Sequence, residues 1–243
     1  MNAMQQPFLN DALKRFIAVL KVVRTWHHHE LYGAEYIPTT GPAILAFNHS
    51  LATYDAFLLG LGIFEKTGRL PQALGDNRIF QIPYLREFAH EIGFVPASPE
   101  TAQNLLAAGH LVYVAPGGMR EALRPSSQRY SVLWAKRKGF IRLSIKTGAP
   151  IVLAACPSAD QIFHIYNNPL TKLAYNYLKF PVPLFRGWGL SFLPRPVKLI
   201  HRIAPPLFPP SAEDNNESVV ETFHAQVIES MNALMNQARG EEA

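Results

Sequence analysis

The chain has 243 residues, of which 48% are hydrophobic and only 17% are charged. That length supports one hydrophobic core without help from disulfides or metals, and the composition excludes an intrinsically disordered chain. The formal net charge of +5 favours an anionic partner, for which both nucleic acid and an acidic membrane surface qualify. No segment reaches the roughly 18 to 20 apolar residues of a spanning helix, and the N-terminus lacks the pattern of a signal peptide.

Residues 8–26 predict an amphipathic helix. Its apolar positions fall on one broad face at about 100° per residue; they are Leu13, Phe16, Val19, Leu20, Val23 and Trp26. Such a helix either lies in a lipid interface, with its basic residues reaching the headgroups, or packs on the core of its own protein. Three histidines follow at residues 27–29, and they point in different directions, so we expect a solvated or interfacial run rather than a metal site.

From residue 43 onward, short apolar runs alternate with helical patterns. Strands are predicted at Ala43–Phe47, Ala73–Gly75, Gly93–Pro96, Leu111–Ala115 and Ile151–Ala155. Helices are predicted at Ala56–Phe64, Tyr84–Glu91, Thr101–Ala108 and Trp134–Lys146. This alternation indicates an α/β fold with a mostly parallel central sheet flanked by helices, in which sites collect at the carboxyl ends of strands.

Residues 157–196 contain aromatic side chains interrupted by prolines, a pattern that does not form one regular element. This segment either covers an acyl channel or contacts a bilayer, or it is a packed loop. Residues 198–204 predict a last strand, and an apolar stripe from Val219 to Met235 predicts a C-terminal helix. We expect two units, a membrane-surface helix over residues 1–32 and one globular domain over residues 33–243. The single cysteine, Cys156, is expected to be an inert core thiol in a reducing compartment.

His49 follows an apolar strand, and Asp55 lies six residues further on. A histidine that removes a proton from a hydroxyl, oriented by a carboxylate, is an economical general base. The spacing does not place both residues on one helix face, so His49 must lie on a turn before the helix or the helix must contain a bulge. Spacing alone leaves a second interpretation open, two hydrogen-bonded loop residues without a catalytic role.

The segment 116–121 is the second candidate site. Gly117 and Gly118 follow a strand and allow close backbone approach, and their N–H groups suit an anion or an oxyanion. Arg120 suits bidentate recognition of a phosphate or carboxylate, with Glu121 beside it. The alternative is a tight turn with a surface Arg–Glu pair.

Three basic residues at 136–138 form the third candidate. Lys136 and Arg137, with Lys138, suit attraction of phosphates of a thioester donor or of anionic lipid, although a solvated helix start is the alternative. The chain has no Gly-x-Ser-x-Gly elbow, no phosphate-loop Gly-Lys-Ser/Thr and no Gly-x-Gly-x-x-Gly fingerprint. Basic residues do not follow a recognisable nucleic-acid module, so no nucleic-acid partner is expected.

Four blocks in order carry a family resemblance; they are Asn48-His49 with Asp55, residues 93–98, residues 115–121 and residues 149–152. Together they resemble the glycerolipid acyltransferase superfamily, over roughly residues 40–205. The resemblance implies an O-acyltransferase domain in residues 33–243, with His49 as general base for an acceptor hydroxyl and Asp55 holding its ring. The thioester of acyl-CoA or acyl carrier protein is then attacked directly, without a metal or other cofactor.

Three departures from the commonest pattern bear on the acceptor. Five residues separate His49 from Asp55 instead of four, and Ala97 and Ser98 stand where an Arg for the acceptor's phosphate is usual. Gly117 stands where the family pattern has a glutamate. Arg120 matches the arginine of that pattern, whereas Glu121 is displaced from the usual position of the glutamate. These features favour the monoacylglycerol and diacylglycerol acyltransferase branch over lysophosphatidate acyltransferases.

The sequence therefore predicts a peripheral enzyme on the cytoplasmic face of a membrane that acylates a neutral glycerolipid or a long-chain alcohol. Gly117, Gly118, Arg120, Glu121, Lys136 and Arg137 are its predicted substrate-binding residues. One alternative is a lysophospholipid acyltransferase in which Arg120 and residues 136–138 hold the phosphate. The other is a catalytically silent lipid-binding protein on the membrane surface.

Overall fold

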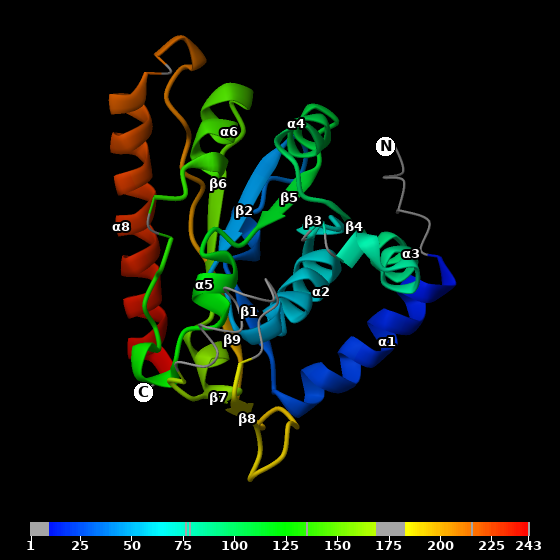
Figure 1. The fold of residues 1–243 in the computed structure, drawn as a ribbon. Coiled ribbons are helices and arrows are strands. Elements are labelled where there is room, and N and C mark those ends of the chain that lie inside the picture. The colour runs from blue at the N-terminus through cyan, green and yellow to red at the C-terminus, as the bar shows by residue number, and fades with distance from the viewer. Residues whose placement is uncertain are drawn as a thin grey trace.

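The computed structural model describes residues 10–168 and 183–242, apart from residues 76, 78, 135 and 215. Its described part contains a seven-stranded central sheet in the order β1-β9-β6-β2-β5-β3-β4 (Figure 1). The strands are β1 (Glu30–Tyr32), β2 (Ala43–Phe47), β3 (Gln72–Gly75), β4 (Phe94–Pro96), β5 (Leu111–Val114), β6 (Ile151–Ala155) and β9 (Ile200–Ile203). The five strands expected between residues 43 and 155 are all present, with ends that differ by at most one residue.

The sheet is mostly parallel, as the alternation of strands and helices predicted. Strand β2 pairs in parallel with both β5 and β6, and β3 pairs in parallel with β4 and β5. Strand β9 runs antiparallel to β6, and β1 pairs in parallel with β9 at the edge. Strand β1 was not expected. The sequence suggested that the globular domain begins at residue 33. Strand β1 occupies residues 30–32, so one strand of the sheet lies outside that predicted domain.

Helices cover both faces of the sheet; they are α1 (Asp11–Trp26), α2 (Ala56–Thr67), α3 (Pro83–Glu91), α4 (Pro99–Ala107), α5 (Gly118–Ala122), α6 (Gly139–Thr147) and α8 (Glu217–Glu242). Side chains of a strand alternate between its two faces, so Ile44 and Ala46 of β2 join one core cluster and Leu45 and Phe47 join another. The first cluster contains α4, α6 and α8, and the second contains α2. Figure 1 shows α8 on one side of the sheet with α1 and α2 on the other.

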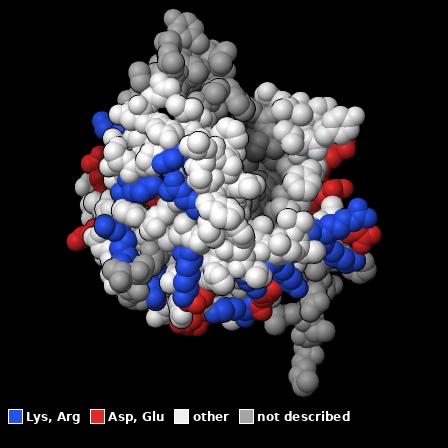
Figure 2. Space-filling view, turned by 90° about the horizontal axis from the view of Figure 1, so that it is seen from below, with Lys and Arg blue, Asp and Glu red and all other residues white. Residues whose placement is uncertain are grey.

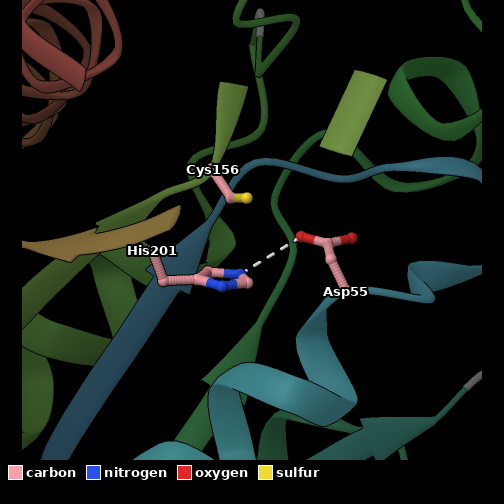
Figure 3. Close-up of side chains that lie close together, drawn as sticks. All are labelled: Asp55, Cys156 and His201. Carbon is pink, nitrogen blue, oxygen red and sulfur yellow. Dashed lines mark ion pairs between the residues drawn. The ribbon is translucent and has the colours of Figure 1, made fainter. Parts of the chain in front are cut away.

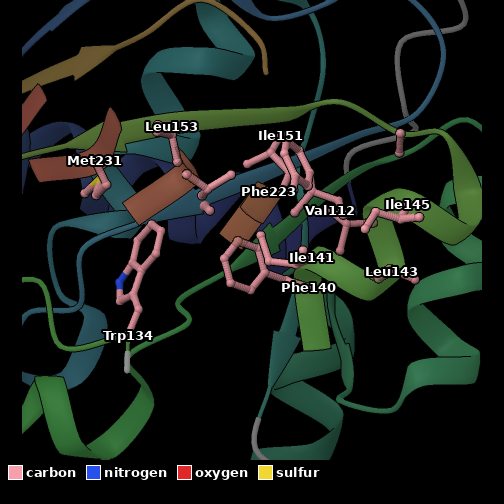
Figure 4. Close-up of a cluster of buried hydrophobic side chains, with 14 of the residues drawn as sticks. Val112, Trp134, Phe140, Ile141, Leu143, Ile145, Ile151, Leu153, Phe223 and Met231 are labelled. Atoms are coloured by element: carbon pink, nitrogen blue, oxygen red, sulfur yellow. The ribbon is translucent and has the colours of Figure 1, made fainter. Parts of the chain in front are cut away.

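The core cluster under α8 is built from aromatic and branched side chains. Figure 4 shows Trp134 and Phe140 beside Phe223 and Met231 of α8. Trp134 is fully buried, and its indole N–H donates to Glu121 (3.3 Å). The sequence placed Trp134 at the start of a helix that ends at Lys146, and this was wrong. Because the indole is held in the core by that hydrogen bond, helix α6 begins only at Gly139.

Helix α1 packs on α2, and its apolar face is divided between the core and the surface. Leu13 and Leu20 are buried, whereas Val19 and Val22 are 58% and 71% exposed. The helix therefore packs on the core of its own protein with one stripe, while other apolar side chains on it remain exposed. Within the described residues, no helix is long and apolar enough to cross a bilayer.

A two-stranded antiparallel ribbon lies apart from the central sheet. It consists of β7 (His164–Ile165) and β8 (Phe185–Arg186), with His164 opposite Arg186. The loop after β8 has exposed apolar side chains, and its Trp188 ring lies 5.7 Å from that of Trp26 at the end of α1. Part of the aromatic segment, including Tyr175, Tyr177 and Phe180, lies outside the described residues.

Candidate active site

His49 lies in the loop that leaves the carboxyl end of β2, where sites collect in a parallel sheet. The preceding residue, Asn48, is 2% exposed, and its amide bonds both backbone groups of Cys156 after β6. Asn48 Oδ1 accepts from the Cys156 N–H (2.9 Å), and Asn48 Nδ2 donates to its carbonyl (3.2 Å). This pair of hydrogen bonds ties the ends of two neighbouring strands together and sets where the His49 loop begins. Cys156 itself is fully buried, as expected of a core thiol.

The His49 ring is held in one tautomer by its own loop. Its Nδ1 lies 2.7 Å from the carbonyl oxygen of Ser50, which can only accept, so Nδ1 carries the proton. Nε2 is left with its lone pair, and Thr53 Oγ1 lies 3.4 Å from it. Burial lowers the pKa of His49 below its usual 6.5, against smaller raising effects from the Ser50 carbonyl and the Asp55 charge. The ring is thus neutral at neutral pH, the form that a general base requires.

Asp55 is buried but does not hold the His49 ring, and the direct pairing expected from the sequence is wrong for this structure. Its carboxylate accepts from Ser50 Oγ and lies 3.3 Å from Nε2 of His201. Between the two predicted partners the chain makes a 3-10 turn at residues 51–53, with Thr53 at a φ of 55°. That turn places His49 before the bend and Asp55 at the start of α2, so they meet through Ser50. The Asp55 charge still acts on His49 by raising its pKa.

Behind Asp55, a chain of hydrogen bonds runs through two histidines. Figure 3 shows the His201 ring from β9 turned toward Asp55, with the Cys156 thiol beside them. The other ring nitrogen of His201 lies 2.9 Å from Nε2 of His29. One ligand-type atom from each of Asp55, Cys156 and His201 lies within 4.8 Å of the others. Among the described contacts, His201 joins Asp55 directly, whereas the Cys156 Sγ lies 3.5 Å from Ser158 Oγ.

The histidines after α1 are therefore not the solvated run that the sequence suggested. His27 is fully buried, and its ring nitrogen lies 2.8 Å from the Val197 carbonyl. His29 bonds His201, and burial followed by the His201 charge lowers the pKa of His29 to about 2. Only His28 is exposed, with a φ of 43°. The chain turns directly from α1 into β1 here, and this brings His27 and His29 against the core.

Glu121 lies buried beneath the His49 loop rather than in a substrate-contacting position. It is 1% exposed, and its carboxylate accepts from the His49 backbone N–H (3.1 Å), the Leu133 N–H (3.1 Å) and the Trp134 indole (3.3 Å). Arg124 forms an ion pair with it at 3.4 Å. Burial raises the pKa of Glu121, although these partners oppose the shift. Glu121 thus positions the backbone of His49 and, through the indole, joins the site to the core.

Gly117 is the neighbour that makes room for this carboxylate. A Cβ at residue 117 would overlap the side chain of Glu121, including a carboxylate oxygen. Glu121 lies four residues after the position where the family pattern has its glutamate. Its side chain nevertheless reaches back to the space beside Gly117. Gly118 has a φ of 52°, and its N–H donates to the Ala115 carbonyl (3.0 Å), so this predicted anion-binding N–H is already used within the turn.

A cavity of about 820 Å³ opens beside His49. Its walls are mostly aliphatic and aromatic, with Leu13, Phe16, Ile17 and Leu20 of α1, Phe57 and Leu61 of α2, Phe94 of β4, and Phe163 and Phe185 of the ribbon among its lining residues. The polar side chains of the lining are those of His49, Thr53, Tyr54, Tyr113 and Arg137. The face seen in Figure 2 is hollowed and carries large uncharged areas. Such a chamber suits a long apolar ligand with one reactive polar end.

The structure brings only part of the predicted substrate-binding set to this cavity. Gly118 and Arg137 line it, and an Arg137 guanidinium nitrogen lies 3.2 Å from where a Cβ on Gly118 would stand. Arg120 and Lys136 are exposed and do not belong to the lining. Lys138 forms ion pairs with Glu217 (2.9 Å) and Glu221 (2.8 Å) of α8.

Two further residues of the site, Tyr113 and His201, were not predicted from the sequence. Tyr113 of β5 lines the cavity while 7% exposed, and its hydroxyl has no hydrogen-bond partner among the described residues. His201 lies some 150 residues from Asp55 in the chain, on the last strand. Neither belongs to a local motif, because only the pairing of distant strands places them here. A buried tyrosine at a strand end and a histidine within an apolar strand were the available hints.

Comparison with known proteins shows which family the chain resembles. A model of the family described as "Diacylglycerol acyltransferase" matches residues 47–241. A Bos taurus protein named "DGAT1/2-independent enzyme synthesizing storage lipids" is 26% identical over 222 residues, which cover 89% of this chain and 66% of that protein. The Homo sapiens protein of the same name is 29% identical over 184 residues, with 75% and 54% covered. An uncharacterized Mycobacterium tuberculosis protein is 27% identical over 198 residues, with 79% and 55% covered.

The chain spans about half to two thirds of the length of these relatives. Among solved structures, it resembles the 1-acyl-sn-glycerophosphate (LPA) acyltransferase PlsC from Thermotoga maritima, with a TM-score of 0.57. The alignment covers 90% of this chain and 77% of PlsC at 19% sequence identity, a likeness of fold. Because the family model covers most of the chain, including the loop of His49 and the turn of Gly117, the chain belongs to the diacylglycerol acyltransferase family.

Proposed function

We propose that the protein transfers a fatty acyl group from a thioester to a lipid hydroxyl, with His49 as the general base. The observation that carries this proposal is an imidazole in the wall of a largely apolar cavity, with Nδ1 bonded to a backbone carbonyl and with a pKa that burial lowers. Nε2 takes the proton of the acceptor hydroxyl as its oxygen attacks the thioester carbonyl carbon. The carbon–sulfur bond then breaks, and the thiol leaves with a proton returned from the imidazolium.

A neutral glycerolipid or a long-chain alcohol is the acceptor that the lining favours. Arg137 is the basic residue among the described lining residues, and the other walls are mostly uncharged. In the block where an arginine is usual, Ser98 instead caps α4, with its side chain accepting from the Thr101 N–H (2.9 Å). The names of the Bos taurus and Homo sapiens relatives, which refer to storage lipids, support the same acceptor class.

The alternative acceptor is a lysophospholipid. It would draw its phosphate contacts from Arg137, because Arg120 and Lys136 lie outside the lining and Lys138 is paired with α8. A catalytically silent lipid-binding protein is the alternative from another class, and it is favoured by the missing His49–Asp55 hydrogen bond. The two alternatives differ in the role of the His49 imidazole. A lysophospholipid acyltransferase needs it for turnover, whereas a silent lipid-binding protein does not.

The donor is an acyl thioester, either acyl-CoA or acyl carrier protein, and no metal takes part in the proposed step. We place the protein on the surface of a membrane, at its cytoplasmic face. Exposed apolar side chains on two neighbouring segments support this placement; they are Val19, Val22 and Trp26 of α1 and Trp188, Leu190 and Phe192 of the loop after β8. Trp26 joins the segments, since its indole N–H donates to the Pro194 carbonyl (3.3 Å).

Purified protein incubated with labelled acyl-CoA or acyl carrier protein tests the proposal. Parallel reactions contain monoacylglycerol, diacylglycerol, a long-chain alcohol or lysophosphatidate. We expect labelled ester from a neutral acceptor, and a strong preference for lysophosphatidate would contradict the neutral-lipid assignment. His49→Ala should lower kcat/KM by about 10² to 10⁴ while the thermal midpoint stays within a few degrees.

His110→Ala is the matched control. His110 is exposed and lies at the amino end of β5, the edge of the sheet opposite the His49 loop. The control should keep full turnover. If His49→Ala also keeps full turnover in a wild-type enzyme that is active, His49 is not the base.

A further inference from the structure

The ribbon β7–β8 brings together three arginines that no candidate site in the sequence included. Arg186 lies on β8 opposite His164. Arg195 is held beside it, with Nε donating to the Gly187 carbonyl (3.1 Å) and its backbone N–H donating to the Ile162 carbonyl (3.2 Å). Arg129 follows the turn at residues 126–128, which is tied to β7 because the Ile165 N–H donates to Ser126 Oγ (2.9 Å). We call Arg129, Arg186 and Arg195 the arginine cluster.

Within the described part of the chain, the arginine cluster lacks the acidic partners that half-buried arginines normally have. Nε and Nη2 of Arg129 and Nε of Arg186 are buried without a hydrogen-bond partner among the described residues. No Asp or Glu of the described residues forms an ion pair with any of the three. Asp160, next to the ribbon in sequence, is already bonded by Arg124 and by the Tyr130 N–H. Residues 161–212 contain six Lys or Arg and no Asp or Glu.

Positive charge therefore accumulates at this place. Burial, then Arg129 and Arg186, lower the pKa of Arg195. Burial and all three arginines lower the pKa of His164, which favours its neutral form. Unpaired buried donors and uncompensated like charges are both unfavourable, and an anion bound among them would relieve both.

The arginine cluster lies next to the lipid cavity. Phe163 and Phe185, the sequence neighbours of His164 and Arg186, line the cavity, and their rings lie 5.3 Å apart. Neighbouring residues of a strand point to opposite faces, so Arg186 of β8 points away from the side on which Phe185 lines the cavity. In Figure 2, groups of basic side chains stand on an otherwise largely uncharged and hollowed face.

We propose that Arg129, Arg186 and Arg195 form a phosphate-binding site at the edge of the cavity. Guanidinium groups bind phosphate oxygens in a bidentate manner, and three of them from separate segments match a group with several such oxygens. The phosphate belongs either to the CoA part of the thioester donor or to the headgroup of an anionic phospholipid. If the phosphate belongs to CoA, the inference rests on the proposed acyl transfer. If it belongs to a phospholipid headgroup, the inference is independent of that proposal.

Binding assays without turnover test this site. Calorimetry with free CoA and with 3′-dephospho-CoA measures donor recognition. Sedimentation with phosphatidylcholine vesicles, with and without phosphatidylglycerol, measures headgroup recognition. Each assay uses wild-type protein and the variants Arg129→Gln, Arg186→Gln and Arg195→Gln. We expect each variant to weaken one of the two interactions by about tenfold or more, the usual effect of removing a charge-assisted hydrogen bond.

Two further variants guard against a purely structural effect. Arg142→Gln removes a positive charge from α6, at the far end of the molecule from β7 and β8 in Figure 1, and should leave both assays unchanged. Arg186→Lys keeps the charge but loses the planar fork, so its affinity should fall between those of wild type and Arg186→Gln. Thermal midpoints show which variants are folded.

The outcomes distinguish CoA from a phospholipid headgroup as the source of the phosphate. They also distinguish failure of the phosphate site from failure of the proposed acyl transfer. Lost CoA binding with unchanged vesicle binding assigns the donor, and the reverse assigns the headgroup. Unchanged affinity in both assays for all three folded Gln variants overturns the site. If wild-type protein binds CoA or anionic vesicles through the arginine cluster but acylates no acceptor, the proposed function fails and the phosphate site stands.

Discussion

At the scale of single residues, the His49 loop is held by two distant parts of the chain and by a contact of its own. Asn48 bonds the backbone after β6, Glu121 accepts the His49 N–H, and the Ser50 carbonyl holds the ring. A base is effective when its geometry is set before the substrate arrives, because reorganisation then costs little during the reaction. The orienting contact is thus a backbone carbonyl, while Asp55 acts on the ring through its charge and through Ser50.

The pH dependence of activity follows from the lowered pKa of His49. A base must be unprotonated, so kcat/KM should be constant near neutral pH and fall as pH drops through the pKa of His49. Because burial lowers that pKa from 6.5, the midpoint of the acidic limb should lie below pH 6.5. Asp55→Asn removes a charge that raises the pKa and should move the midpoint to still lower pH. A wild-type midpoint above 6.5 would contradict a buried neutral base.

Gly117→Ala tests whether Glu121 positions the loop. The added methyl overlaps the Glu121 side chain, so the carboxylate must leave the His49 N–H. We expect a loss of about 1 to 3 kcal/mol in unfolding free energy and a fall in kcat larger than any change in KM. Gly139→Ala is the matched control, since a Cβ there meets nothing within 4 Å. Equal kinetics for the two variants would show that Glu121 is only a structural residue.

At the scale of elements, α1 has a role in the core and another on the surface. Its buried side lines the cavity, and removal of the helix would open the chamber as well as expose Leu58 and Leu61 of α2. Deletion of the N-terminal segment therefore does not test membrane binding cleanly. Substitution on the exposed side leaves the packing on α2 in place.

Val22→Asp should weaken binding to vesicles. Val22 is 71% exposed, and a carboxylate there cannot enter the acyl boundary and is repelled by anionic lipid. We expect the bound fraction in vesicle sedimentation to fall severalfold, with the thermal midpoint nearly unchanged. Phe208→Asp is the control, because Phe208 is 72% exposed but follows Leu207, which bridges to the amino end of β6. Equal losses for both variants would mean that binding is not directed through α1.

At the scale of the whole molecule, the sheet separates two layers, a packed hydrophobic core on one face and the cavity on the other. Helices α6 and α8 bury one face together with Trp134, whereas the cavity lies over the other face between α1, α2 and the ribbon. Glu121 connects the layers, since it bonds both the Trp134 indole and the His49 loop.

Substitution in α8 should therefore change stability without changing substrate affinity. Met231→Ala removes a fully buried side chain and should cost about 2 to 5 kcal/mol of unfolding free energy, measured by denaturant titration. KM should stay at the wild-type value wherever the variant is folded. Asn232→Ala, the exposed neighbour on the same helix, should change stability by no more than about 0.5 kcal/mol. A raised KM for Met231→Ala would show that the two layers are coupled.

The sequence by itself determined the α/β class, the strands between residues 43 and 155, and the family blocks around His49 and Gly117. Local hydrophobic periodicity and short motifs carry that information, because each depends on residues close together in the chain. The same patterns gave no access to β1, to the short ribbon, or to the start of α6 after Trp134.

Only the tertiary structure decided which side chains meet. The Asp55–His201 contact, the Glu121 carboxylate under the His49 loop and the arginine cluster all join segments that lie far apart in the sequence or cross a turn. Hydrogen bonds and charge pairs depend on distances of a few ångströms, and those distances follow from strand order and loop path rather than from residue spacing. For that reason His49 was visible in the sequence, while the partners that orient it were not.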